Sequence, residues 1–130
     1  MKVLGIAAWI AVAGCNATED RPETLAYITE AILAPSCGTA TCHSAMKREF
    51  GYAFDSVAGA QESMALGLIA PCAEAPCPPG NSYLIQVIST IDSRGNRMPL
   101  DAPLANKDID LIATWIEDGA FGYTPPAVPQ

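Results

Sequence analysis

Two cysteine pairs of identical spacing constrain this chain more than any other feature of its sequence. Cys37 and Cys42 lie in "PSCGTATCHSA", and Cys72 and Cys77 lie in "PCAEAPCPPG", with four residues between the cysteines in each case. His43, the only histidine of the 130-residue chain, directly follows the first pair. No histidine follows the second pair, so the second pair is an internal comparison for the first.

The first fifteen residues predict export. Met1 and Lys2 precede the apolar run "VLGIAAWIAVA", which is too short to cross a bilayer. The stretch "VAGC" is similar to the lipobox of bacterial lipoproteins, in which cleavage precedes the cysteine and Cys15 is acylated. The alternative is a plain signal peptide. We predict a lipoprotein signal peptide over 1–14, a polar tether over 15–22, and a protein lipid-anchored on the periplasmic side of a bacterial membrane.

Charge and compartment narrow the possible partners. Fourteen Asp and Glu residues oppose seven Lys and Arg residues. Nucleic acid is therefore excluded as a partner, because binding it requires basic residues that neutralise phosphates. Outside the inner membrane the surroundings are oxidising, so each cysteine other than Cys15 needs a partner. In a cytosolic protein the same four cysteines would indicate zinc.

Apolar residues at helical spacing predict three helices. We expect Pro22 to open the first, Pro35 to stop it, and Asn106 to cap the last. A second helix is expected to begin after Asp55 or Ser56. The expected helical ranges are 22–34, 56–69 and 106–119.

The remaining segments are less regular. "SYLIQVIST" fits either a strand or a helix, whereas the proline-rich "APCAEAPCPPGN" and the turn-rich "DSRGNRMPLDAPLAN" are expected to be loops. The segment 122–130 is proline-rich and expected to be extended. The predicted class is all-α, with three or four helices. Long loops in so small a domain need an organiser besides secondary structure, and a large flat cofactor would be one.

Three chemistries fit the first pair. Haem attachment uses two cysteine thioethers and a histidine directly after the second cysteine, usually as C-x-x-C-H. Here Cys42 and His43 keep that relation and only Cys37 is displaced, with Gly38 supplying the unusual dihedrals of a bulge. The alternatives are a disulfide within each pair, or a metal site built from both pairs. The second pair, in its proline-rich loop, is expected to be a disulfide.

Around this motif the chain resembles a class I c-type cytochrome. The resemblance rests on a helix before "CGTATCH", a late loop with "NRMP", a "PPGNSYLIQV" segment before that loop, and the closing helix "DIDLIATWIEDGA". It implies a cytochrome c-like domain over 23–121, several helices around one haem, and a helical "SYLIQVIST". The four-residue spacing is its departure from the usual motif.

The resemblance also implies the roles of individual residues. One covalent haem c would be held by Cys37 and Cys42, with His43 and Met98 as axial ligands of the iron. Because no second histidine exists, bis-histidine ligation within the chain is excluded. Met46 lies on the same side of the ring as His43, and Met64 falls in a predicted helix, where core packing is expected. The resemblance further places Trp115, Phe50 and Phe54 around the ring.

The predicted function is carriage of single electrons between redox partner proteins, and not enzymatic turnover. No phosphate-binding glycine loop is present, and no second histidine is available to activate a nucleophile. The alternative function is that of a disulfide-clipped envelope lipoprotein without a cofactor, which would bind another envelope component.

Overall fold

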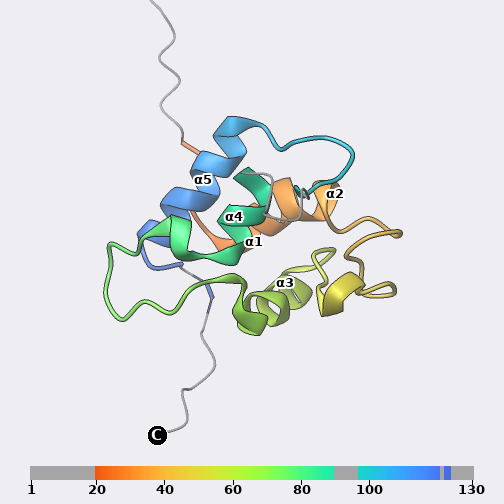
Figure 1. The fold of residues 1–130 in the computed structure, drawn as a ribbon, viewed down its shortest axis with the longest axis horizontal. Helices are drawn as coiled ribbons and strands as arrows, with labels where there is room; N and C mark the ends of the chain where they lie inside the picture. The colour runs from red at the N-terminus through yellow and green to blue at the C-terminus, as the bar shows by residue number, and fades with distance from the viewer. Residues whose placement is uncertain (1–19, 90–96, 121, 124–130) are drawn as a thin grey trace, which may run out of the picture.

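The fold was analysed in a computed structural model that describes residues 20–89, 97–120 and 122–123. All regular secondary structure in these residues is helical, which confirms the all-α class (Figure 1). None of the described helices is long and apolar enough to cross a membrane. The predicted signal peptide, Cys15 and most of the proline-rich tail lie outside the described residues. The elements are α1 (Leu25–Ile28), η1 (Thr29–Leu33), α2 (Ala34–Ser36), η2 (Glu49–Gly51), α3 (Val57–Ser63), η3 (Met64–Leu68), η4 (Pro79–Asn81), α4 (Tyr83–Ser89) and α5 (Asn106–Glu117).

The first helical region runs through α1, η1 and α2 without a break. Thr24 caps it, because its side chain accepts a hydrogen bond from the backbone N–H of Tyr27, so the helix starts later than the predicted Pro22. Pro35 lies inside the last turn and does not stop the helix there. The turn before it is π-helical, with Ala34 N–H donating to the carbonyl of Thr29. Such a wider turn accommodates a residue that lacks the N–H for a regular helical bond.

The second helical region, α3 continued by η3, begins as predicted. Of the two candidate caps, Ser56 is the cap and accepts a hydrogen bond from Gly59 N–H at 3.1 Å. The Asp55 carboxylate instead accepts from Ala45 N–H at 2.8 Å. The region ends at Leu68, after Gly67 adopts a left-handed φ of +93°.

Within the ambiguous segment "SYLIQVIST", Tyr83–Ser89 forms α4, which confirms the helical prediction for these residues. Ser82 lies just before this helix, and its hydroxyl accepts a hydrogen bond from Ala70 N–H at 3.0 Å. The start of α4 is thereby tied to the end of η3.

The last helix, α5, contains the predicted apolar stripe but not the predicted cap. Asn106 is its first helical residue, and Ala105 occupies the cap position without a side-chain hydrogen bond. The Arg21 guanidinium instead pairs with the Asp108 carboxylate and donates to the carbonyl of Lys107. An anionic side chain in the first turn also suits the positive end of the helix dipole. The buried residues of α5 are Leu111, Ile112, Trp115 and Ile116.

One apolar core joins the helical regions, and the two longest loops lie at one side of it. The core includes Ile28, Leu33, Met64, Ile88 and Ile112, all fully buried. The loop after α2 and the loop before α5 both extend toward the right side of Figure 1. Residues of both loops line the same cavity, so the fold brings these distant segments of the chain together.

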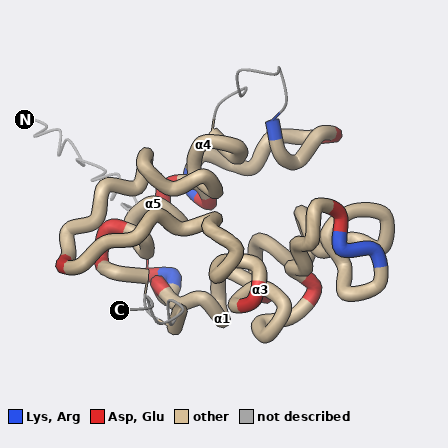
Figure 2. The backbone as a smooth tube through the Cα atoms, turned by 60° about the horizontal axis from the view of Figure 1, so that its bottom comes forward, with Lys and Arg blue, Asp and Glu red and all other residues tan. Residues whose placement is uncertain are grey.

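Charged residues are spread over many segments of the described chain. Figure 2 shows acidic and basic positions interspersed along the tube, with acidic positions the more frequent. No continuous basic stripe crosses the described residues.

Gly38 permits the closest backbone approach in the loop after α2. A Cβ at this position would lie 2.7 Å from the backbone N of Asp55 and 2.8 Å from the carbonyl carbon of Phe54. Its φ is outside the left-handed range, so the expected role in supplying unusual dihedrals is wrong. Glycine is needed here because two backbone segments touch.

We expect Gly38→Ala to lower the free energy of unfolding by about 1–3 kcal/mol, as overpacking against a rigid backbone does. Urea denaturation checks this. Gly80→Ala is the matched control, because a Cβ there meets no atom within 4 Å, and it should change stability by less than about 0.5 kcal/mol. Equal effects of the two substitutions would contradict the close approach.

Candidate functional site

Two adjoining cavities lie between the loop after α2, the segment before α5 and the face of α4. Their volumes are about 220 Å³ and 650 Å³. Both are lined by Cys37, His43, Phe50 and Met98. Pockets for small molecules and cofactors commonly measure roughly 300–1,000 Å³. The fold therefore brings all four predicted haem-contacting residues to the wall of the larger cavity, and all of them except Cys42 also line the smaller one.

His43 is held in one orientation. It is only 9% exposed, and its Nδ1 lies 3.0 Å from the carbonyl oxygen of Glu49. Because a carbonyl only accepts, Nδ1 carries the proton in this contact, and in the neutral imidazole Nε2 then offers a lone pair. The Phe54 ring meets the imidazole edge-on, with centroids 5.5 Å apart. A histidine whose Nδ1–H is bound to a backbone carbonyl has the arrangement typical of a metal ligand.

The two cysteines of the first pair have different surroundings. Cys37 is buried at the wall of both cavities, whereas Cys42 is exposed. The intervening loop is folded by two backbone bonds, from His43 N–H to the Cys37 carbonyl and from Cys42 N–H to the Thr39 carbonyl, both at 3.0 Å. Burial raises the pKa of the Cys37 thiol to about 11, with smaller contributions from Cys42 and Asp101. Cys37 is therefore a protonated thiol at neutral pH.

The second pair behaves as predicted. Cys72 and Cys77 form a disulfide, with their Cα atoms 5.8 Å apart, whereas Cys37 and Cys42 are free thiols. The backbone N–H of Cys77 also donates to the Glu117 carbonyl at 2.8 Å, which fixes the disulfide loop to the end of α5. Two sulfurs of the alternative four-cysteine metal site are thus already bonded to each other. No cluster of three His, Cys, Asp or Glu side chains suited to a metal ion occurs within 20–89, 97–120 and 122–123.

The three described methionines differ in burial and in their place relative to the cavities. Met98 lines both cavities, and its backbone N–H donates to the Val87 carbonyl in α4 at 2.8 Å. Met64 is fully buried in the core, which confirms its predicted packing role, and Met46 is 97% exposed. Neither of these two lines a cavity. Met98 is therefore the one described methionine that shares a cavity with His43.

The aromatic residues were predicted only in part. Phe50 and Phe54 line the smaller cavity, as expected. Trp115 is fully buried in the core and lines neither cavity. Tyr52 and Tyr83 line the smaller cavity and were missed. The signal that marked Tyr52 was its place two residues before Phe54 in "FGYAF", since side chains two residues apart in an extended segment face the same side, and the two rings stack.

Comparison with protein-family models, with curated proteins and with solved structures found no match.

We expect Cys42 to be alkylated well before Cys37 in the haem-free chain. The thiolate is the reactive form, and a pKa of about 11 leaves only about one Cys37 in a thousand ionised at pH 8. The alkylation rate of Cys37 should rise about tenfold per pH unit until the pH reaches that pKa. Iodoacetamide labelling followed by peptide mass spectrometry measures both rates. A Cys37 that reacts as fast as Cys42 at pH 8 would contradict the burial described above.

Proposed function

We propose that this protein is a lipid-anchored, monohaem c-type cytochrome that carries single electrons between redox partner proteins in the bacterial envelope. The observation that carries this proposal is the shared cavity wall of Cys37, His43 and Met98. A cytochrome c-like arrangement of the helices around one haem belongs to the same proposal. Electron carriage requires no substrate turnover, so the protein would not be an enzyme.

The residues present fit a haem. His43 offers Nε2 as a ligand because its Nδ1–H is bound to the Glu49 carbonyl. Met98 offers a thioether to the same space, and Cys37 and Cys42 offer free thiols where attachment requires them. The smaller cavity is walled mainly by apolar and aromatic side chains, which suit a flat apolar ring.

Haem bound at these residues would supply one-electron redox chemistry. His43 and Met98 would be the two iron ligands that the chain supplies. Methionine as a ligand favours a higher reduction potential than a second histidine would. Phe54 and Leu84 would exclude water from the cavity wall, which also tunes the potential. Glu49, through its carbonyl, would keep the imidazole proton on Nδ1.

A location outside the inner membrane belongs to the same proposal. The disulfide between Cys72 and Cys77 is the kind of bond that persists in an oxidising compartment. Acylation of Cys15 would attach the domain to the membrane surface, and its partners there would be redox proteins. Cys15 lies outside the described residues, so its acylation is inferred from the sequence alone.

Expression with the haem-attachment machinery tests the function directly. We expect a Soret band that survives denaturation, and a mature mass that includes one haem and the lipid on Cys15. Replacement of His43 by Ala should abolish low-spin haem without removing the lipid. A full-length product with neither a Soret band nor the haem mass would end this proposal and favour the disulfide-clipped binding lipoprotein.

We expect Met98→Ala to remove the near-infrared band that methionine ligation gives the ferric protein, and to lower the reduction potential. Met46→Ala is the matched control, because Met46 is exposed and lines neither cavity. Its spectrum should equal that of the unmodified protein. An unchanged spectrum in Met98→Ala would transfer the ligand role to Met64 or to water.

A further inference from the structure

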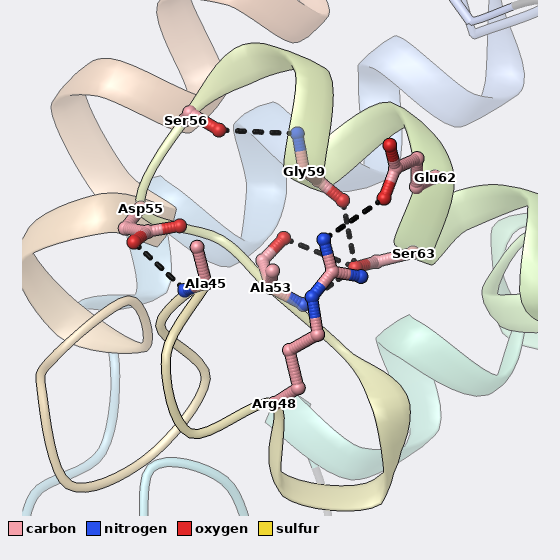
Figure 3. A network of polar contacts seen from close by, with 8 residues as sticks. All are labelled: Ala45, Arg48, Ala53, Asp55, Ser56, Gly59, Glu62 and Ser63. Atoms are coloured by element: carbon pink, nitrogen blue, oxygen red, sulfur yellow. Dashed lines mark hydrogen bonds and ion pairs between the residues drawn. The ribbon is translucent and has the colours of Figure 1, made fainter.

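Two neighbouring residues at the end of α3, Glu62 and Ser63, reach the segment that carries His43 (Figure 3). Neither residue lines a cavity. The two residues contact different neighbours of His43. Glu62 contacts the turn that carries Glu49, and Ser63 contacts the segment that carries Phe54.

Ser63 makes the buried contact. Its side chain is 1% exposed, and its hydroxyl accepts from the backbone N–H of Ala53 at 2.8 Å. The same oxygen lies 3.0 Å from the Ala53 carbonyl and 2.8 Å from the Gly59 carbonyl, either of which can accept its proton. One hydroxyl therefore accepts from the N–H of the fully buried Ala53 and can donate either to the Ala53 carbonyl or to the Gly59 carbonyl. Removal of that hydroxyl leaves Ala53 N–H buried without a partner.

Ala53 directly precedes a residue that contacts His43. Phe54, the next residue, donates its backbone N–H to the His43 carbonyl at 2.6 Å. Its ring meets the imidazole of His43 edge-on at a centroid distance of 5.5 Å. Backbone and side chain of Phe54 thus both contact His43, and the position of Phe54 depends on how Ala53 is held.

Glu62 makes the surface contact. Its carboxylate pairs with Arg48 at 3.1 Å. Arg48 and Phe50 adopt left-handed φ values of +45° and +54°, which are costly for residues with a Cβ and need support from their surroundings. The turn between them presents the Glu49 carbonyl to His43 Nδ1. Because both side chains of the ion pair are largely exposed, this contact is the weaker of the two.

We propose that Ser63 is a positioning residue for His43, with the Arg48–Glu62 pair as its weaker counterpart, so that α3 sets the orientation and tautomer of the imidazole. In the haem-loaded protein this control would extend to the reduction potential, and that part rests on the proposed function. The control of the Nδ1–H itself does not require haem.

Solvent exchange of the His43 Nδ1–H, followed by NMR in the full-length, histidine-labelled chain at pH 8, tests this proposal. We expect Ser63→Ala to accelerate exchange roughly 5- to 30-fold, the factor that matches loss of one buried hydrogen-bond partner. The imidazole nitrogen shifts should also move toward a mixture of the two tautomers. Ser63→Thr, which keeps the hydroxyl, should restore slow exchange.

Two control variants separate positioning from general destabilisation. Thr114→Ala removes a hydroxyl that donates to a carbonyl four residues earlier, as Ser63 does toward Gly59, but on an exposed face of α5. Ile112→Val weakens the core within α5, away from both cavities. Neither variant should change the exchange rate or the tautomer of His43.

Three outcomes decide the question. A folded Ser63→Ala protein with unchanged exchange and tautomer would overturn the proposal. If Ser63→Ala fails to fold, Glu62→Gln decides, since it changes only an exposed ion pair, and the proposal then stands or falls on whether exchange accelerates. A chain that shows the expected exchange but binds no haem would refute the proposed function and leave the positioning by α3 intact.

Discussion

The contact between the backbone at Gly38 and the backbone at Phe54 and Asp55 is the constraint on which the site depends. It closes the loop after α2 onto the segment before α3, at a distance that no side chain allows. His43 lies between these two points of the chain, so the closure brings it against Phe54. The His43 carbonyl accepts from the Phe54 N–H, and the two rings are in contact. The cavity wall follows from that closure, because Cys37 precedes the contact and Phe54 belongs to it.

The sequence was sufficient for the main helices and for the cysteines, the histidine and the methionine that meet at the larger cavity, but not for Tyr52 and Tyr83. Periodic apolar residues located α5 and the region from α3 to η3, because a buried helical face leaves a regular pattern. Caps were less predictable. Asn106 has the right chemistry for a cap, yet the Arg21 ion pair with Asp108 holds the start of α5 from a segment 87 residues away. Such a contact depends on tertiary structure, which local sequence does not encode.

The support around His43 could not be predicted for the same reason. Ser63 is one of several serines, and nothing in its immediate sequence distinguishes it from a surface residue. Its role arises because α3 places it against Ala53, ten residues earlier in the chain. Likewise, the sequence predicts Gly38 for its backbone freedom, whereas the structure requires a glycine there because two backbone segments leave no space for a Cβ. Sequence patterns identify residues with reactive chemistry more readily than those that hold them in place.

The disulfide loop has a consequence for how this domain tolerates change. Residues 71–76 are exposed, and the loop is fastened at its two ends, by the Ala70–Ser82 bond and by the bond from Cys77 to the end of α5. None of residues 71–77 lines either cavity. Because this loop shares no residue with either cavity, we expect an insertion or an affinity tag within 73–76 to leave His43 and Met98 in place.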